Sequence, residues 1–219
     1  MALVKRRPKT LALGIEYRGT ASMAGRCSQI TRAFRRRLSG AFAVCRSSDL
    51  CNLCRTNGYR RSRHSPSGEF SSAARRPSAG WIRGVNAILP ESVAVRWMRE
   101  ADEKFHARFS ARSRTYEYWI WNDPVRSPLF EGSAGWVFRP LDEALMQRGA
   151  AALIGEHDFT SFRASECQAK TPVRTISELK IVRRGALVGV RITANAFLQH
   201  MVRNIVGALI YVGTGREKP

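Results

Sequence analysis

The sequence has few acidic residues for its length, with 17 Asp and Glu against 37 Lys and Arg in 219 residues. The formal net charge of +20 favours polyanions as partners, and nucleic acid is the first of these to consider. The chain also lacks an apolar run long enough to cross a bilayer, which excludes a membrane-spanning protein. The stretch behind the basic opening, LALGIEY, is too short for a secretory signal. We therefore expect no membrane partner.

Cysteine is scarce as well, with five residues, an odd number. Without a secretory context this number argues against a disulfide scaffold and for the reducing cytoplasm. Cys51 and Cys54 form a C-x-x-C pair with His64 nearby. A structural zinc site takes four ligands in a coherent pattern, and this group does not supply them. The sequence therefore predicts a cytoplasmic protein without a metal site.

Lysine is absent from residues 21–76, where twelve Arg stand against one Asp and one Glu. This segment alone supplies half of the net charge, and it shows no sustained period of 2 or 3.6 residues. Its central stretch, LCRTNGYRRSRH (53–64), can be interpreted as a nucleic-acid-binding arm, as a metal knuckle, or as sequence that does not belong there. The remaining residues are basic too, so the expected preference for polyanions does not depend on this segment.

The rest of the chain carries regular patterns of apolar residues. Alternation with a period of two predicts strands at 10–19, at 92–98 and within 105–122, and a hairpin over 176–195 that turns at Arg184–Gly185. A helix is expected over 140–155, with Asp142 as N-cap and Gly155 as stop, and an amphipathic helix over 195–213. Together these elements predict an α+β domain with an antiparallel sheet. The residues expected to share one face of their strand or helix are, in four groups, Leu11, Leu13, Ile15 and Tyr17; Val93, Val95 and Trp97; Tyr116, Tyr118 and Ile120, opposite Glu117, Trp119 and Trp121; and Phe197, Met201, Val202, Ile205 and Leu209.

Several long blocks resemble the tRNA pseudouridine synthase A family in order and spacing. They are LALGIEYRG, GWIRGVNAILP, the stretch AVRWMREADEKFHARFSARSRTYEYWIWN, GEHDFTSFRA with CQAKTPVRTI, and ANAFLQHMVRNIVGALIYVGTGREKP. The resemblance covers roughly 10–20 and 77–219. It implies an α+β fold of two ferredoxin-like-derived halves, whose antiparallel sheets flank a basic cleft, and usually a homodimer. The implied N-terminal half is 1–104, and the C-terminal half is 105–219 without the family's C-terminal tail.

The family's signature block, A-G-R-T-D-x-G-V-H-A with the nucleophilic Asp, is missing from this sequence. The codons of Cys54 to His64, read one base later, can spell A-G-R-T-D-T-G-V-H-A-T. Upstream, Met23 has a single codon, so its shifted codon must encode Trp, and Ala24 can follow as Gln, a pair that the family has near there. We therefore interpret residues 21–76 as translated out of frame, and expect this part of the N-terminal half to be disordered or misfolded.

The resemblance also implies the chemistry of the site. The family's Asp carboxylate acts as covalent catalyst on a nucleotide flipped from its stack, and no cofactor is needed. In this chain the position of that Asp is overlaid by Gly58 or, in the printed frame, by Asn57, and neither can serve as nucleophile. Arg203 matches the arginine that pairs with the Asp. Tyr116 matches the tyrosine that stacks on the target uracil, although by spacing alone it would be a core strand residue.

Four further basic residues lie in blocks that resemble the family's RNA-facing strands and loops, namely Arg108, Arg163, Lys170 and Arg174. Phosphate contacts and a solvated surface are both consistent with their sequence context. A packed rather than catalytic role is expected for His200, a core position for Phe159 and Phe162, and a spectator thiol for Cys167.

Three functions remain open on the sequence alone. The chain can be a tRNA pseudouridine synthase that isomerises uridine in the anticodon stem-loop, which is the function of the family it resembles. Alternatively, it is an inactive remnant of that enzyme, because the Asp motif is missing. A third possibility is a basic RNA-binding module without catalysis. In each case tRNA is the expected partner.

Overall fold

The computed structural model describes residues 8–17, 67–72, 74–89, 91, 93–107 and 110–219. The chain divides into two units, residues 1–111 and 112–219, and each is described by itself. The boundary after residue 104, which concerns the halves of the family fold, stays a prediction. Within the described residues, no helix is long and apolar enough to span a membrane.

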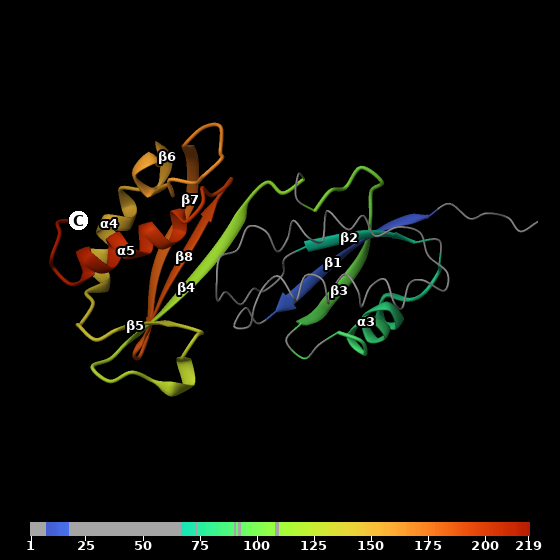
Figure 1. The fold of residues 1–219 in the computed structure, drawn as a ribbon, viewed down its shortest axis with the longest axis horizontal. Coiled ribbons are helices and arrows are strands. Elements are labelled where there is room, and N and C mark those ends of the chain that lie inside the picture. The colour runs from blue at the N-terminus through green and yellow to red at the C-terminus, as the bar shows by residue number, and fades with distance from the viewer. Residues whose placement is uncertain (1–7, 18–66, 73, 90, 92, 108–109) are drawn as a thin grey trace, which may run out of the picture. The chain divides into compact units, whose positions relative to one another are not determined.

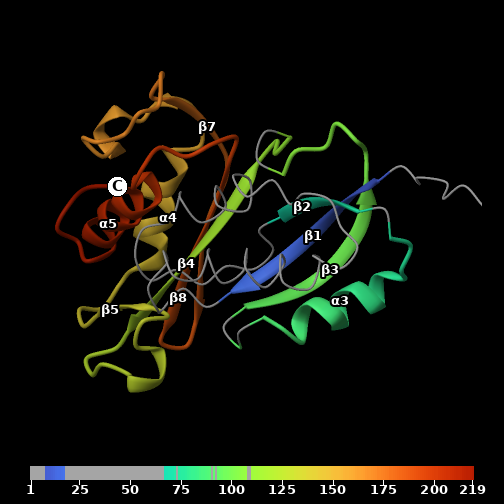
Figure 2. The same cartoon turned by 45° about the vertical axis from the view of Figure 1, so that its right-hand side comes forward.

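Unit 1 contains a three-stranded antiparallel sheet in the order β2-β1-β3, formed by Ser67–Ser72, Lys9–Tyr17 and Val93–Ala101. Helix α3 (Ser78–Asn86) packs along β3 (Figures 1 and 2) and buries Trp81 and Val85. The core consists of these two side chains with Leu11, Leu13, Ile15, Val93, Val95 and Met98.

Strand β1 differs in one respect from the half-buried strand that its alternation predicts. Leu11, Leu13 and Ile15 are in the core as expected, but Ala12 and Gly14 between them are buried too. As the central strand, β1 has hydrogen-bonded neighbours on both edges. Gly14 lies against the indole of Trp97, because a Cβ built on this glycine would be only 2.1 Å from Trp97 Nε1.

A β-bulge changes which face of β3 is buried. The register against β1 shifts between Gly14 and Ile15, so that Ile15 pairs with Val95 and Gly14 with Trp97. The extra residue reverses the alternation beyond the bulge. Val93, Val95 and Met98 are therefore buried, and the prediction that Trp97 shares a face with the two valines is wrong.

Unit 2 contains a five-stranded sheet in the order β5-β4-β8-β7-β6, with α4 and α5 side by side on one face (Figures 1 and 2). All neighbours are antiparallel except β4 and β5. The strands are β4 (Arg114–Asn122), β5 (Gly135–Val137), β6 (Gly155–Asp158), β7 (Val173–Arg184) and β8 (Leu187–Ala194). The helices are α4 (Glu143–Ala151) and α5 (Met201–Gly213), with 3-10 turns η1 (Pro128–Phe130) and η2 (Thr160–Phe162).

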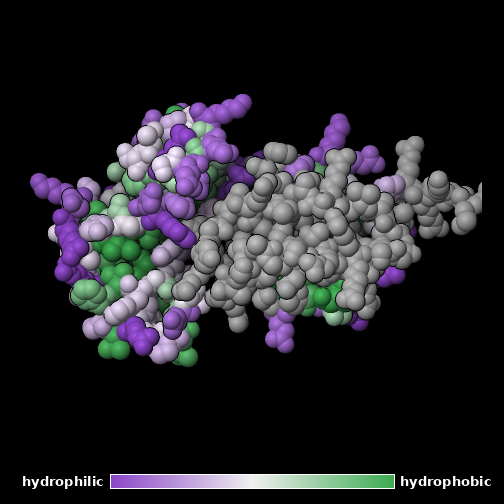
Figure 3. All heavy atoms as spheres, viewed as in Figure 1, coloured by the Kyte–Doolittle hydropathy of each residue, from purple (hydrophilic) through white to green (hydrophobic). Residues whose placement is uncertain are grey.

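The core of unit 2 lies between this sheet and the two helices. It includes Ile120 and Val190 of the sheet together with Met146, Met201 and Ile205 of the helices, each with no exposed surface. Figure 3 shows polar side chains over much of the visible face of this unit, with hydrophobic atoms reaching the surface at the lower left. The mixed α+β architecture predicted from the sequence is confirmed.

The predicted start of α4 is confirmed, and its predicted end is wrong. The Asp142 carboxylate accepts hydrogen bonds from the backbone N–H groups of Ala144 and Leu145, at 2.8 and 3.0 Å. The helix ends at Ala151 rather than at Gly155. Gly155 instead begins β6 with φ +106°, a conformation that glycine adopts without steric strain.

The predicted hairpin is present, with its turn one residue further along the chain. Arg184 still pairs with Leu187, so the connecting residues are Gly185 and Ala186. Gly185 has φ +60°, which explains why this position is a glycine.

Helix α5 is shorter than its apolar stripe suggested. It begins at Met201, because His200 adopts the left-handed conformation with φ 63°. For a residue other than glycine this conformation costs about 1–2 kcal/mol. Phe197, which was expected on the apolar stripe of the helix, precedes it.

Candidate functional site

Tyr116 lies in β4, opposite Ile192 of the neighbouring strand β8. Its side chain is half-buried at the border of the unit 2 core. The ring meets that of Phe197 edge to face, with centroids 5.0 Å apart and planes at 86°. Such a contact fixes the orientation of an aromatic ring. Tyr116 is therefore held between the sheet and the segment that leads into α5.

That segment, residues 195–200, is joined to the loop 159–172 by backbone and side-chain hydrogen bonds. The N–H of Ala164 donates to the carbonyl of Gln199 at 3.1 Å, and the N–H of Gln199 donates to Cys167 Sγ at 3.4 Å. Asn204 Nδ2, in the first turn of α5, donates to the carbonyl of Phe162 at 3.0 Å. The loop and the start of α5 thus form one connected structure.

Arg163 follows η2 in this loop, and its guanidinium donates a hydrogen bond to the carbonyl of Cys167. Burial raises the pKa of the Cys167 thiol, but the backbone N–H groups of Gln199 and Ala169 and the charge of Arg163 outweigh burial and lower the pKa overall. Cys167 accepts a hydrogen bond that ties the loop to the start of α5, and its expected part as a spectator thiol in the chemistry stays a prediction.

Arg203 lies in the first turn of α5, with its side chain exposed. Its neighbours in the sequence are apolar, but the Arg203 side chain does not lie among them. Met201, Val202, Ile205 and Val206 around it all turn toward the core. The left-handed residue His200 comes just before the helix and is itself exposed, so the expectation that it is a packed residue is wrong.

Arg174 and Lys170 lie further along the same loop and in the strand that follows. Arg174 is in β7, paired with His157 of β6, and its Nη1 donates to the carbonyl of Val173 at 2.5 Å. Its Nε is buried and has no hydrogen-bond partner among the described residues. Lys170 is exposed. Next to Arg174, Thr175 exchanges backbone and side-chain hydrogen bonds with Asn195, which connects β7 to the segment before α5.

Three of the predicted residues are placed in unit 2, each by a different contact or element. The Tyr116 ring contacts Phe197. Arg163 donates a hydrogen bond to the carbonyl of Cys167, in the loop whose Ala164 N–H bonds to Gln199. Arg203 lies in the first turn of α5. Arg108 and the overlaid positions Gly58 and Asn57 lie outside the described residues, as do Cys51, Cys54 and His64. Where the structure describes the chain, no three His, Cys, Asp or Glu side chains form a group that could hold a metal ion.

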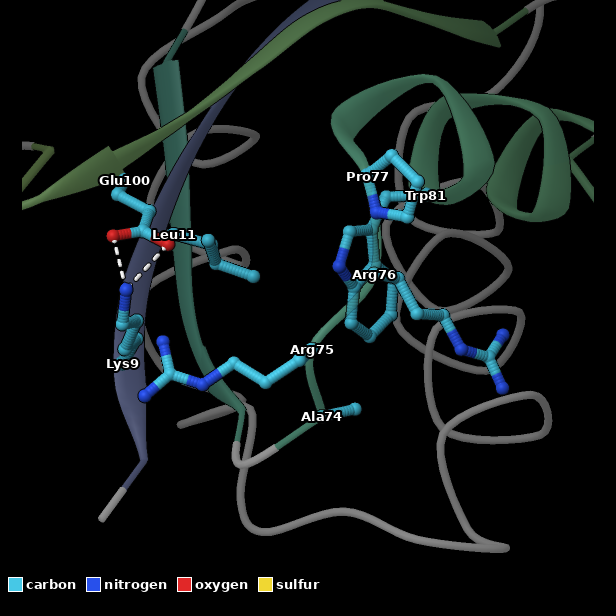
Figure 4. A pocket seen from close by; sticks show the side chains of 8 residues that line it. All are labelled: Lys9, Leu11, Ala74, Arg75, Arg76, Pro77, Trp81 and Glu100. Atoms are coloured by element: carbon cyan, nitrogen blue, oxygen red, sulfur yellow. Dashed lines mark hydrogen bonds and ion pairs between the residues drawn. The ribbon is translucent and has the colours of Figure 1, made fainter. Parts of the chain in front are cut away.

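A pocket of about 310 Å³ lies in unit 1 (Figure 4), and none of the predicted site residues is among its described lining. Lys9 forms an ion pair with Glu100 at 2.6 Å on one side, and the Arg76 guanidinium lies 5.7 Å from the ring centroid of Trp81 on the other. The Arg75 side chain lies between these two sides of the pocket and extends toward Lys9. Because Glu100 neutralises Lys9, the pocket combines apolar walls with the two arginines.

Comparison with known proteins shows which family the chain is related to. A family model described as tRNA pseudouridine synthase matches residues 150–219. A tRNA pseudouridine synthase A of Herminiimonas arsenicoxydans is 59% identical over 154 residues, 68% of this chain and 56% of that protein. One of Janthinobacterium sp. (strain Marseille) is 44% identical over 223 residues, 96% of this chain and 80% of that protein. The chain belongs to the tRNA pseudouridine synthase A family.

The extent of the match differs between relatives. The chain spans about half the length of the relatives from Herminiimonas arsenicoxydans and Bordetella petrii, at 56% and 53%, and four fifths of the Janthinobacterium protein. The part matched by the family model contains Arg163, Lys170, Arg174 and Arg203. The resemblance to the tRNA pseudouridine synthase A family that the sequence blocks indicated is confirmed.

Several residues of this region were not found from the sequence. Gln199, Asn204 and Asn195 hold the loop and the strand end through backbone partners that are distant in the chain. Phe197 was assigned to a helix stripe, although its ring contacts Tyr116. One signal in the sequence could have revealed the start of α5, namely the two asparagines on either side of it, Asn195 and Asn204. Asn is unfavourable inside helices and favoured at their ends.

Proposed function

We propose that this chain derives from a tRNA uridine isomerase of the tRNA pseudouridine synthase A family. In that reaction the N1–C1′ bond of uridine breaks, C5 bonds to C1′, the C5 proton leaves to solvent and N1 takes up a proton. The substrate is the anticodon stem-loop of tRNA. The observation that carries the proposal is the 44% identity over 96% of this chain to a tRNA pseudouridine synthase A. The residues that match the family's site, Tyr116, Arg163 and Arg203, all lie in unit 2.

The roles of these residues follow from their chemistry. Tyr116 offers the stacking face for the extruded uracil, and the edge contact from Phe197 fixes its plane. Arg203 pairs with the family's aspartate and keeps that carboxylate ionised. Arg108, Arg163, Lys170 and Arg174 contact phosphates. No cofactor takes part, and the protein acts in the cytoplasm as a homodimer, with the site in a basic cleft between two ferredoxin-like halves.

We further propose that the chain in its printed sequence is inactive, because residues 21–76 are out of frame and the aspartate is missing from position 58 or 57. Two observations support this. The Arg excess without Lys is confined to that segment. The alignment that extends over nearly the whole chain has a lower identity than the one limited to about two thirds of it, at 44% against 59%.

The test compares two proteins in a tritium-release assay on tRNA labelled at C5 of uridine. The first is the printed chain, with its mass verified. The second comes from a gene in which the reading frame is restored between codons 20 and 80. We expect release from the second protein only, and its loss when the restored protein carries Arg203→Ala. Turnover by the printed chain would refute the inactivity. No turnover by either chain, with both proteins folded, would refute the isomerase proposal.

The net charge of +20 also favours the second candidate, a basic RNA-binding module without catalysis. It differs from a misfolded remnant in two measurable ways, namely a cooperative thermal transition and salt-dependent tRNA binding.

A further inference from the structure

The pocket in unit 1 that Figure 4 shows takes no part in the proposed isomerisation. Its volume of about 310 Å³ is at the lower end of the range for small-molecule sites. Empty cavities inside proteins are apolar, whereas three of the described lining residues, Lys9, Arg75 and Arg76, carry a positive charge. Apolar walls with a few polar groups at fixed positions are typical of a ligand site.

The apolar walls come from the core of unit 1. Leu11 of β1 and Trp81 of α3 both belong to that core, and Figure 4 shows the Leu11 side chain directed toward the side on which Trp81 lies. Pro77, the residue before α3, lies next to the indole. Core side chains are close-packed and keep their rotamers, so this part of the pocket has a defined shape. It can hold a flat apolar group.

The segment that carries the two arginines is anchored at both ends. The N–H of Ala74 donates a hydrogen bond to Oγ of the buried Ser72 at 3.1 Å. At the other end, the carbonyl of Pro77 accepts the first hydrogen bonds of α3. Arg75 and Arg76 lie between these anchors, and Figure 4 shows their side chains extending to different sides of the pocket. The positive groups therefore have fixed points of attachment.

The charges of the lining decide which class of ligand fits. Lys9 Nζ contacts both carboxylate oxygens of Glu100, at 2.6 and 2.7 Å, so these two charges offset each other. Arg75 and Arg76 are exposed, and neither has a carboxylate partner among the described residues. Three positive side chains and one carboxylate give the described lining a net charge of +2.

This charge matches a phosphomonoester better than other common anions. A phosphomonoester carries roughly 1.5 to 2 negative charges at pH 7 and has three acceptor oxygens, whereas a carboxylate or a phosphodiester carries one charge. The planar guanidinium binds phosphate oxygens in pairs. The apolar walls suit a flat ring such as a nucleobase, and a volume of about 310 Å³ suits one nucleotide rather than several.

We propose that this pocket binds a mononucleotide, whose phosphate the two arginines bind and whose base lies against Leu11 and Trp81. The site does not depend on the proposed isomerisation. Because Arg75 and Arg76 lie at the end of the segment 21–76, it belongs to the chain in its printed sequence, and this full chain is used in the tests. A free nucleotide and the 5′-phosphorylated end of an RNA present the same chemistry, and the last test separates these two sources.

The first test compares a nucleotide with its two parts. Isothermal titration calorimetry in about 50 mM salt, where screening is weak, measures the affinity of the full chain for UMP, uridine and inorganic phosphate. We expect UMP to bind at least about tenfold more tightly than either part, because only UMP occupies both the charged and the apolar side of the pocket. Equal affinities for UMP and phosphate would indicate general attraction of anions to a basic chain and would overturn the proposal. So would the absence of UMP binding at millimolar concentration.

The second test uses a matched pair of arginine variants. Arg75→Gln removes one guanidinium from the pocket and should weaken UMP binding by about tenfold. Arg83→Gln removes the same charge from an exposed position in the last turn of α3, outside the described lining, and should leave the affinity unchanged. Equal effects of the two substitutions would show that only the net charge matters, and would overturn the site.

The third test changes the affinity in the opposite direction. Glu100→Gln removes the carboxylate that neutralises Lys9, so the ammonium becomes available to the phosphate and UMP should bind about threefold more tightly. Glu91→Gln is the control, because Glu91 is exposed and precedes β3 at the end opposite to Glu100. An affinity of Glu100→Gln that is unchanged or weaker would contradict the proposed position of the phosphate. All four substituted residues are exposed, so no variant removes a core contact, and circular dichroism checks each fold.

The source of the nucleotide follows from two dinucleotides, pUpU with a 5′-phosphate and UpU without one. Tighter binding of pUpU than of UMP would assign the pocket to the end of an RNA, and weaker binding would assign it to a free nucleotide. In both cases UpU should bind more weakly than pUpU, because it lacks the phosphomonoester. Equal binding of UpU and pUpU would overturn the proposal.

Discussion

At the scale of single residues, glycines and short polar side chains account for most of the geometry that the sequence pattern left open. Gly189 and Gly14 each lie beneath a tryptophan ring, so their lack of a Cβ is a packing requirement rather than a turn signal. Cys167 and Asn204 join the loop 159–172 to α5. These partners are distant in the chain, which is why no local pattern reveals them.

A pair of glycine substitutions separates packing from backbone entropy. A Cβ on Gly189 would lie 2.9 Å from the Trp119 ring, whereas one on Gly207 in α5 would meet nothing within 4 Å. We expect Gly189→Ala to destabilise unit 2 by about 1–3 kcal/mol and Gly207→Ala to stabilise it by about 0.5–1 kcal/mol. Urea unfolding of both variants measures this. A destabilising Gly207→Ala with a neutral Gly189→Ala would contradict the packing described here.

The Asp158 carboxylate gives a prediction on pH. Hydrogen bonds from the side chain and then the backbone of Thr160 lower its pKa from the ordinary value of 3.8. A group with a lowered folded-state pKa stabilises the fold above its unfolded-state pKa, and this stabilisation is lost as the pH falls through the folded-state value.

The difference in unfolding free energy between the chain and Asp158→Asn should therefore be constant from about pH 5 to 7 and shrink below about pH 4. Thr160→Ala removes one donor and should show a smaller change of the same sign. Unfolding measured by urea at several pH values gives the answer. A difference that grows as the pH falls would show that the carboxylate is not stabilised in this way.

At the scale of elements, sequence periodicity predicted which strands and helices exist better than it predicted where each begins and ends. The hairpin β7–β8, the strand β4 and the start of α4 were all predicted. The bulge in β3 and the late start of α5 were not, because each depends on a backbone conformation selected by tertiary contacts. The alternation of apolar residues in the sequence continues past a bulge, although the buried face of the strand changes there, so the sequence does not mark the bulge.

The N-cap of α4 is the element most directly encoded in the sequence. Asp142→Ala removes the acceptor for two backbone N–H groups and should destabilise unit 2 by about 1 kcal/mol. Asp142→Asn keeps a side-chain oxygen in place and should recover most of that loss. Thermal unfolding of both variants measures the difference. Equal losses from the two substitutions would indicate that the charge, rather than the cap, carries the effect.

At the scale of the whole molecule, the two informative properties are the net charge and the family to which the chain belongs. The net charge of +20 comes in equal parts from residues 21–76 and from the other 163 residues. Membership of the tRNA pseudouridine synthase A family gives the remaining residues a context in which tRNA is the expected polyanion. The segment 21–76 contributes charge without the family's signature sequence.

Binding of tRNA should therefore be mainly electrostatic. If the chain binds with about six phosphate contacts, its affinity should fall by roughly three orders of magnitude between 50 and 200 mM salt. Fluorescence anisotropy with labelled tRNA over this range measures the slope. The matched variants are Lys170→Ala and Lys180→Ala, because Lys170 is a predicted phosphate contact whereas Lys180 forms an ion pair with Glu178 at 2.9 Å. Only Lys170→Ala should reduce the slope, by about one contact.

The sequence by itself determined the family, the α+β class, the positions of most strands and helices, and the absence of the family's signature block from the printed reading. These properties depend on local patterns of residues and on residue identities, which do not change with the conformation of the chain. Only the tertiary structure decided that Tyr116 meets Phe197, that Cys167 ties its loop to Gln199, and that Val125 and Leu129 between β4 and β5 face solvent. Each of these depends on which segments meet, and an amino-acid pattern carries no distance between residues that are far apart in the chain.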